Sequence, residues 1–293
     1  MSTMEVLSPG LLTTVQDLGR EGFGPMGVSP SGAADPIALR IGNRLVGNLG
    51  GAAGLEMTLL GGAFQFHGAC VVALTGSDFG ATLDGVPVHA WTPFEAKQSQ
   101  TLRLGPTRSG ARCYLCARGG IQVKPFLGSA STHLLSGLGG HEGRALRKGD
   151  VLKIGCSPEG EKKETGRKAG STGGTHHPRK VSAKALEELA PRKVLRVTPG
   201  PQSNWFPRAA QKALYESAYR VSEETNRMGL RLEGPSIPGG AHGEMISEGV
   251  SLGAIQIAAG GLPIILFVEQ QTTGGYAKIA NVVAADLSSL GQL

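Results

Sequence analysis

A glycine-rich segment from Gly137 to Arg144 combines residue types that could transfer protons and bind an anion. Its glycines would let backbone amides approach a ligand closely. His141 and Glu142 can donate or accept a proton, and Arg144 can bind a carboxylate or phosphate through two parallel hydrogen bonds. A flexible surface loop with solvated charges is an equally good interpretation of the same residues.

Two other segments could bind a carboxylate or an amide. Residues 28–35 contain Ser31 and lead into a predicted helix, whose positively polarised N-terminal end favours anions. An ordinary helix cap explains these residues more simply. In residues 225–229, Asn226 and Arg227 can together hold a planar amide or carboxylate. A solvated surface arginine is the more common outcome.

A fourth candidate is the loop 271–276, which follows the apolar run 263–268. Gln271, Thr272 and Thr273 precede two glycines, and a strand that runs into a loop rich in glycine and hydroxyl groups often builds an anion site. A plain turn is an equally good interpretation. The sequence contains no GxxxxGK[ST] phosphate loop and no HExxH zinc motif, and we predict no metal site.

The net charge of +6 could suggest a nucleic-acid-binding protein. Half of this excess comes from residues 157–180, where six basic and three acidic residues lie in a composition typical of a solvated linker. Aromatic residues make up only 5% of the chain, so no base-stacking surface is evident. We therefore predict no nucleic-acid partner.

The sequence also argues against a metal-binding cysteine pair and a membrane segment. Cys113 and Cys116 belong to a strand-like apolar run, where positions three apart point to opposite faces and cannot share a metal ion. The N-terminal residues lack the basic and apolar parts of a signal peptide. The longest apolar stretch, 254–268, is interrupted by Gln256 and Pro263 and is too short to span a bilayer. These features predict a cytoplasmic location.

Glycine accounts for 46 of the 293 residues, about twice its usual share of roughly 7%. Together with short apolar runs, this composition predicts many short strands joined by turns. Regions of this kind span residues 1–156 and 192–293 and are separated by a charged, glycine-rich linker at 157–191. Because strands and helices do not alternate in either region, two β-barrel-like domains fit better than a parallel α/β sheet.

Three local signals predict individual elements. Asp35 and Pro36 can cap and open a helix, in which the apolar positions 37, 41 and 45 repeat every four residues on one face. Pro207 can open a second helix. The dipeptide Asp84-Gly85 lies between two strand-like runs and tolerates the positive φ angles of a tight hairpin turn.

Seven stretches of the chain match motifs of a known family, in the family's order and over nearly the whole sequence. They are Gly10–Arg20, Pro30–Asp35, Asn43–Asn48, Gly139–Leu146, Asn226–Gly229, Ser247–Gly249 and Gln271–Tyr276. On these motifs the chain resembles the C subunits of bacterial ATP-dependent 5-oxoprolinases. This is the KipA-like, allophanate hydrolase subunit 2-type group of the biotin-dependent carboxyltransferase family.

The resemblance implies a mainly β protein with two tandem cyclophilin-like β-barrel domains and a few short helices. It also implies a cytoplasmic hydrolase complex with a KipI-like B subunit and a LamB/YcsF-like A subunit. That complex would use ATP, bound to this or another subunit, to open 5-oxo-L-proline to L-glutamate. Opening a lactam requires activation of its amide, for example by phosphorylation of the carbonyl oxygen, and an anion site with arginines would stabilise the developing charge.

The motifs then suggest roles for individual residues. We expect Arg144 or Arg227 to hold a carboxylate and His141 or Glu142 to act as the acid or base. Hydrogen bonds to the substrate are expected from the loop that begins at Gln271. The full set of expected substrate-binding residues is Ser31, Asn226, Arg227, Glu248, Gln271, Thr272 and Thr273.

The chain departs from the family pattern at four places, one of which is its unusually long and charged inter-domain segment. Glu269 stands where the family usually has Asp, and Ala277 stands where it usually has Pro. Relatives continue for about one strand beyond Leu293, from which we expect the second domain to lack a closing strand.

Two other functions remain open. One is a carboxyltransferase component that moves a carboxyl group from carboxybiotin to a urea-like amide nitrogen. The chain has no Met-Lys-Met biotinylation site, so biotin would arrive on another polypeptide. The other is a non-enzymatic regulator that binds a KipI-like partner.

Overall fold

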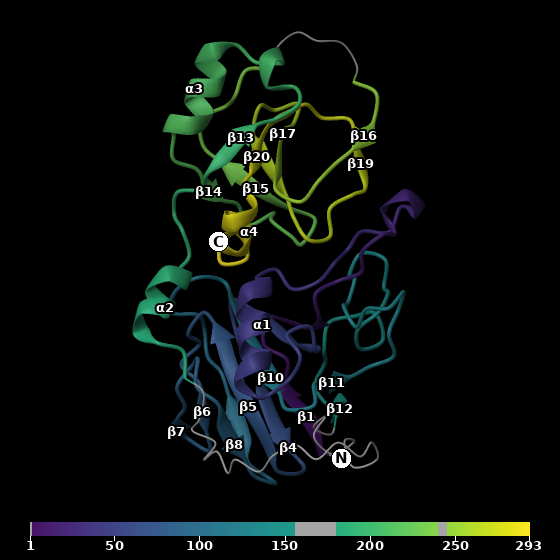
Figure 1. Ribbon diagram of the computed structural model, residues 1–293, viewed down its shortest axis with the longest axis vertical. Helices are drawn as coiled ribbons and strands as arrows, with labels where there is room; N and C mark the ends of the chain where they lie inside the picture. Colours follow the sequence, from purple (N-terminus) through teal and green to yellow (C-terminus); the bar gives the residue numbers. More distant parts are fainter. Residues whose placement is uncertain (1, 156–179, 240–244) are drawn as a thin grey trace, which may run out of the picture. The chain divides into compact units, whose positions relative to one another are not determined.

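The computed structural model describes residues 2–155, 180–239 and 245–293. Its contacts divide the chain into two compact units (Figure 1). Unit 1 comprises residues 1–19, 35–190 and 292, and unit 2 comprises residues 20–34, 191–291 and 293. Most of the predicted linker at 157–191 lies outside the described residues, and its last part contains helix α2 (Ala183–Leu189).

Unit 1 is built from two antiparallel sheets. One has the strand order β11-β12-β1-β4-β9-β6-β7, and the other has the order β2-β3-β10-β5-β8. The strands are β1 (Ser2–Ser8), β2 (Leu12–Gln16), β3 (Gly54–Thr58), β4 (Ala63–Phe66), β5 (Cys70–Gly76), β6 (Thr82–Leu83), β7 (Val86–Pro87), β8 (Phe94–Ala96), β9 (Thr101–Arg103), β10 (Arg112–Ala117), β11 (Ile121–Gln122) and β12 (Val151–Ile154).

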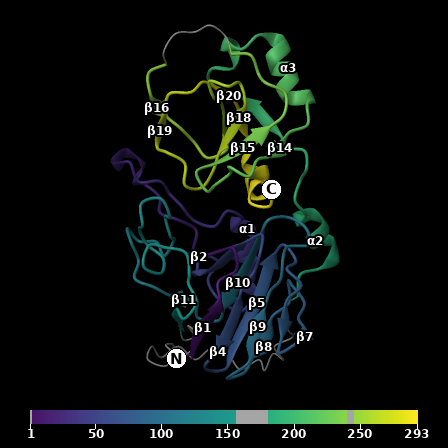
Figure 2. The ribbon, with the colours of Figure 1, turned by 180° about the vertical axis from the view of Figure 1, so that it is seen from behind.

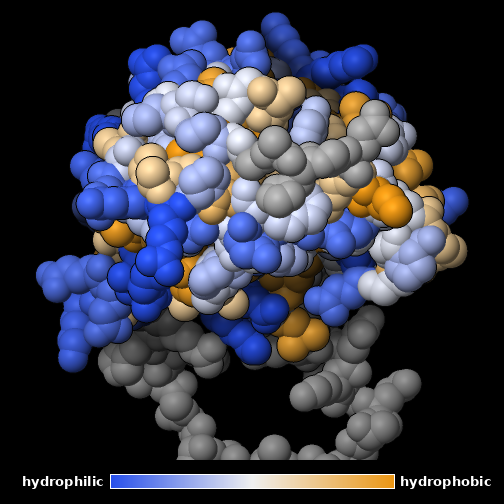
Figure 3. All heavy atoms as spheres, turned by 90° about the horizontal axis from the view of Figure 1, so that it is seen from above, coloured by the Kyte–Doolittle hydropathy of each residue, from blue (hydrophilic) through white to orange (hydrophobic). Residues whose placement is uncertain are grey.

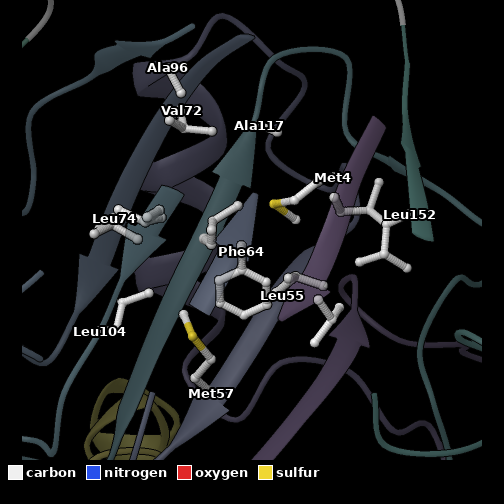
Figure 4. Close-up of a cluster of buried hydrophobic side chains, with 14 of the residues drawn as sticks. Met4, Leu55, Met57, Phe64, Val72, Leu74, Ala96, Leu104, Ala117 and Leu152 are labelled. Carbon is white, nitrogen blue, oxygen red and sulfur yellow. The ribbon is translucent and has the colours of Figure 1, made fainter. Parts of the chain in front are cut away.

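Alternate side chains of these strands form one apolar core in unit 1 (Figure 4). Met4 on β1, Leu55 and Met57 on β3, and Phe64 on β4 are fully buried there. Side chains from both sheets contribute to it. Along each strand only alternate residues enter the core, because successive residues of a strand point to opposite faces. The core therefore fixes the register of the strands, since a shift by one residue would expose these side chains.

Strand β10 is buried on both faces, which explains its continuous apolar run. Cys113 lies in the core of unit 1, whereas the Cys116 thiol lies 3.7 Å from the carbonyl oxygen of Leu39 in helix α1 (Pro36–Leu45). The two thiols thus point to opposite faces, as the sequence predicted.

Helix α1 lies over β5 and β10 (Figures 1 and 2). It starts at the predicted residue, because the Asp35 carboxylate accepts a hydrogen bond from the Ala38 N–H at 3.0 Å. Its buried face agrees with the predicted one only at Leu45. Ile37 is exposed, and the residues that pack inward include Leu39 and Gly42. A helix this close to a sheet needs a small residue at the contact, and that requirement outweighs the four-residue repeat.

The predicted Asp84-Gly85 hairpin is confirmed. Strands β6 and β7 pair in antiparallel register on either side of it. Asp84 has a φ of 48° and Gly85 a φ of 82°, and positive φ at both central positions is what this tight turn requires.

Unit 2 contains a six-stranded antiparallel sheet of order β13-β20-β17-β18-β15-β14 and a separate pair, β16 and β19. An apolar core lies against the larger sheet and includes Ala34, Phe206 and Phe267. The strands are β13 (Val197–Pro199), β14 (Arg220–Val221), β15 (Gly229–Glu233), β16 (Glu248–Gly249), β17 (Ala254–Ile257), β18 (Pro263–Leu266), β19 (Thr273–Gly274) and β20 (Lys278–Val282).

The helices of unit 2 are short. The second predicted helix is confirmed as α3 (Arg208–Glu216), with Pro207 as its N-cap residue. The others are α4 (Leu287–Leu290) and the 3-10 turns η1 (Gly24–Met26), η3 (Ser203–Trp205) and η4 (Ala284–Asp286). The face shown in Figure 3 is mostly hydrophilic, with hydrophobic side chains scattered over it, as expected for a solvated surface.

The prediction of a mainly β protein with a few short helices is confirmed. The predicted closed β-barrels are not found in the described residues. Each of the sheets in the described part of the chain has two end strands and does not close into a ring. The larger sheets end in β11 and β7, in β2 and β8, and in β13 and β14, and each of these end strands pairs with only one neighbour.

Replacing Gly42 by Ala should test the contact of α1 with the sheet. A Cβ atom at position 42 would lie 2.7 Å from the Cys116 sulfur and 2.8 Å from the Thr75 hydroxyl. Within a solvated helix this change stabilises by about 1 kcal/mol, but overpacking here should reduce the free energy of unfolding by roughly 1–3 kcal/mol. Urea unfolding measures the change. The double variant Gly42→Ala/Cys116→Ala should recover part of the loss, and a more stable Gly42→Ala protein would contradict the contact.

Candidate functional site

A buried lysine lies at the centre of a polar cluster in unit 2. Lys278 begins β20, and its side chain is 4% exposed. Its ammonium group donates a hydrogen bond to Oε1 of Glu248. Gln202 Nε2 donates to the same oxygen at 2.7 Å, and the Gln202 side-chain oxygen accepts from the Lys278 backbone N–H at 3.1 Å. A cation this deeply buried requires such partners, because desolvation is otherwise too costly.

The ladder between β16 and β19 brings the predicted Gln-Thr-Thr loop next to this cluster. Glu248 lies opposite Gly274, and Gly249 lies opposite Thr273. A side chain at position 274 would come within 2.8 Å of the Gln256 amide nitrogen and 3.0 Å of the Gln271 amide nitrogen. Glycine at this position therefore allows two side-chain amides to approach the ladder.

The carboxylate of Glu248 is the part of the cluster that solvent reaches. Its side chain is 45% exposed, and the hydrogen bonds from Lys278 and Gln202 both go to Oε1. These hydrogen bonds, first that of Lys278, lower the pKa of Glu248, so the group is ionised at neutral pH. An ionised, accessible carboxylate can accept the N–H of an amide ligand.

Arg227 has carboxylate and carbonyl partners within unit 2. Its Nε lies 2.5 Å from Oε1 of Glu269, and Nη2 donates to the Gly32 carbonyl oxygen at 2.6 Å. The side chains of Arg227 and Glu269 are both buried, at 5% and 2% exposure. Glu269, at the position where the family usually has Asp, is thus the carboxylate partner of Arg227. The hydrogen bond from Arg227 to Gly32 helps to hold residues 28–34 within unit 2. A substrate carboxylate would have to compete with Glu269 for the guanidinium group of Arg227.

Asn226 and Ser31 have different surroundings. The Asn226 side-chain oxygen accepts hydrogen bonds from the N–H groups of Met228 and Gly229, so this residue shapes a turn. Ser31 has a φ of 54°, and its hydroxyl is buried without a hydrogen-bond partner among the described residues, as is that of Ser29. Buried hydroxyls without partners are costly, so this loop retains hydrogen-bonding capacity.

In unit 1, the predicted acid–base loop forms an ionic cluster around Arg144. Nη1 and Nη2 of Arg144 donate to the two carboxylate oxygens of Asp150 at 2.8 and 3.0 Å, and Nη2 also donates to Glu142 at 2.6 Å. His141 Nε2 lies 3.5 Å from Asp150. The hydrogen bonds of Arg144 lower the pKa of Asp150 to about 2, so both partners are charged at neutral pH.

The structure therefore divides the predicted site residues into two groups. His141, Glu142 and Arg144 lie together in unit 1. The predicted substrate-binding residues all belong to unit 2, where the β16–β19 ladder joins Glu248 to the loop of Gln271, Thr272 and Thr273.

Sequence reasoning missed three residues that organise these groups. They are Lys278, Gln202 and Asp150. The one usable signal was a lysine at the head of the apolar strand 278–282, since an unpaired lysine is rarely buried. Gln202 and Asp150 carry no local signal.

Two kinds of feature are absent from the described part of the chain. In residues 2–155, 180–239 and 245–293, no three His, Cys, Asp or Glu residues are grouped so that they could hold a metal ion. None of the helices in these same segments has the length and apolar character needed to cross a membrane.

Comparison with known proteins identifies the family. Residues 26–293 match the family described as carboxyltransferase domain, subdomain A and B. The chain belongs to this carboxyltransferase family. It is 38% identical over 290 residues to the C subunit of the 5-oxoprolinase of Escherichia coli (strain K12), covering 99% of this chain and 87% of that protein.

Two other relatives are much longer than this chain. The urea amidolyase of Saccharomyces cerevisiae is 34% identical over 306 residues, which cover this whole chain but 16% of that protein. The crystal structure of TTHA0988 superposes with a TM-score of 0.82 at 35% identity. The chain is covered completely in that comparison and spans about half (54%) of TTHA0988.

Replacing Asp150 by Asn should destabilise unit 1 at neutral pH by roughly 1–3 kcal/mol, because Arg144 loses its charged partner. The folded-state pKa of about 2 lies below the ordinary value of 3.8. The stabilisation is therefore complete above about pH 4 and is lost as the pH falls toward 2. Thermal unfolding from pH 2 to 7 should show the wild-type and Asp150→Asn curves converging at low pH. Glu142→Gln is the matched control, since its side chain is 67% exposed. An equal loss in both variants would contradict the central role of Asp150.

Proposed function

We propose that this chain is the C subunit of an ATP-dependent 5-oxoprolinase, which opens 5-oxo-L-proline to L-glutamate. The observation that carries the proposal is the match to the C subunit of the Escherichia coli 5-oxoprolinase, which extends over 99% of this chain and 87% of that relative. A match over most of the length of both chains supports the same role more strongly than a match to 16% of a urea amidolyase does.

The proposed enzyme is a cytoplasmic heteromer. A KipI-like B subunit and a LamB/YcsF-like A subunit are its proposed partners, and ATP is the co-substrate of the complex. The chain has no GxxxxGK[ST] loop, which supports an ATP site built largely by another subunit. In the proposed reaction, the γ-phosphoryl group moves to the lactam carbonyl oxygen and ADP leaves. One water then opens the ring C–N bond, and a second releases phosphate from the resulting acyl phosphate.

The cluster around Lys278 supports a role in binding the lactam. The ionised Glu248 carboxylate would accept the ring N–H. Thr273, on the paired strand β19, and Gln271, which precedes that strand, would donate hydrogen bonds. Lys278 would act as a positioning residue, since its ammonium holds Glu248 in place and keeps it ionised. His141 and Glu142 remain the proposed acid and base, and Arg144, Arg227, Asn226 and Ser31 remain proposed ligand contacts.

Reconstitution tests the proposal directly. The chain is co-expressed with its A- and B-type partners, and 5-oxoproline-dependent release of ADP and glutamate is measured while each subunit is omitted in turn. We expect release only when all three chains are present. A folded complex of this chain with its B-type partner that releases no glutamate with any A-type partner would refute the proposal.

Lys278→Met should reduce kcat/KM of the reconstituted enzyme by roughly 10²-fold. Because Lys278 lowers the pKa of Glu248, its loss should also raise that pKa and move the acid limb of the pH–rate profile to higher pH. The control is Lys212→Met, whose side chain in the same unit is 71% exposed. A fall in activity without a shift of the acid limb would indicate that Lys278 supports only the fold.

Carboxyl transfer is the second candidate, favoured by the full-length match of this chain to the Saccharomyces cerevisiae urea amidolyase and by the family itself. In that case biotin would arrive on another polypeptide, because the chain has no Met-Lys-Met motif. Biotin-dependent carboxylation of a urea-like amide by this chain and its B-type partner, without glutamate release, would select this function.

A further inference from the structure

The side-chain amide of Gln292 is enclosed by a set of buried polar groups in unit 1. Its Oε1 accepts hydrogen bonds from the Ser77 hydroxyl at 2.8 Å and from the backbone N–H groups of Ala111 and Arg112 at 3.2 and 3.0 Å. Its Nε2 donates to Oδ2 of Asp35 at 2.8 Å and to the Arg112 carbonyl oxygen at 3.2 Å. Both the oxygen and the nitrogen of the Gln292 side-chain amide therefore have hydrogen-bond partners.

The backbone around the Gln292 side chain leaves room for a planar amide group. Gly76 and Gly110 have φ angles of 86° and 72°. A Cβ atom at position 76 would lie 3.2 Å from the Gln292 nitrogen, and one at position 110 would lie 2.9 Å from the Gln292 oxygen. Glycine at both positions thus leaves room for the amide plane. Ser77, Asp35 and Gln292 are 6%, 8% and 6% exposed, so the cluster is shielded from solvent.

The pattern of donors and acceptors distinguishes between ligand classes. Three donors converge on one oxygen, and two acceptors face one nitrogen. A primary amide has the two N–H groups that this arrangement requires, whereas a lactam or secondary amide has only one. A carboxylate has none, and it would be repelled by the carboxylate of Asp35.

We propose that Asp35, Ser77 and the backbone of Ala111 and Arg112 form a binding site for a primary amide, either a carboxamide or a urea-type group, which Gln292 occupies in cis. The site goes beyond the proposed 5-oxoprolinase function, because a lactam would satisfy only half of its acceptors. A free ligand has to displace Gln292, which competes from the same chain at a high effective concentration. The wild-type protein therefore binds such ligands more weakly than a chain that lacks this side chain.

Chemical rescue of Gln292→Ala tests the site. The substitution removes a fragment equivalent to acetamide, so added acetamide can refill the vacated space. Binding of so small a ligand should saturate in the ~10 mM range and should raise the melting temperature of the variant by roughly 3–5 °C at about ten times the dissociation constant. Wild-type protein should show no such shift at the same concentrations. 2-Pyrrolidinone, with one N–H, should act more weakly than acetamide.

Three controls separate specific binding from a solvent effect. Acetate and N,N-dimethylacetamide should not stabilise Gln292→Ala, because one is charged and the other has no N–H. Gln122→Ala removes the same group from an exposed residue of β11 and should not respond to acetamide. Adding Ser77→Ala to Gln292→Ala should weaken the response at least about threefold, since one of the donors is lost.

An equal response of wild type, Gln122→Ala and Gln292→Ala to acetamide would overturn the proposal, and so would equal stabilisation by acetate. If Gln292→Ala does not fold alone, the yield of folded protein after refolding with and without acetamide replaces the melting temperature. No gain in that yield would also overturn it. Because these measurements need neither ATP nor partner subunits, their outcome is independent of the glutamate-release assay.

Discussion

Asp35 is buried with a carboxylate whose charge has to be compensated inside unit 1. Oδ1 caps α1 through the Ala38 N–H, and Oδ2 accepts from Gln292. The backbone N–H of Asp35 donates to the Tyr114 hydroxyl at 2.7 Å, and that hydroxyl donates to Glu56 at 2.8 Å. Burial raises the pKa of Asp35, and the hydrogen bond from Gln292 opposes this rise. The start of α1, and with it the contact of Gly42 with β10, depends on this network.

The cations of the candidate site follow one rule: each is already paired with a carboxylate of the protein. Arg144 binds Asp150, Arg227 binds Glu269, and Lys278 binds Glu248. A ligand therefore meets charges whose positions are fixed before it arrives, which reduces the ordering that binding requires. The groups with remaining capacity are acceptors and hydroxyls, such as the exposed carboxylate of Glu248 and the buried hydroxyl of Ser31.

Sequence reasoning succeeded where a signal is local and failed where partners are distant. Asp84-Gly85 and the Asp35 cap are decided by neighbouring residues, and both were predicted correctly. Glu248 and Lys278 are 30 residues apart and meet only because β16, β19 and β20 form as they do. In the same way, residues 20–34 cluster with unit 2, and the hydrogen bond from Arg227 to Gly32 that helps hold them spans 195 positions. Neither hydrophobic periodicity nor composition predicts contacts between residues so far apart in the sequence.

The seven-stranded sheet of unit 1 ends on both sides in strands of only two residues, β11 and β7. In β7, Pro87 has no backbone N–H to donate, and one edge of the strand is already paired with β6. These short end strands therefore leave few backbone donors and acceptors with which a strand of a neighbouring molecule could pair. Concentrated solutions of the protein should therefore resist edge-to-edge aggregation through this sheet.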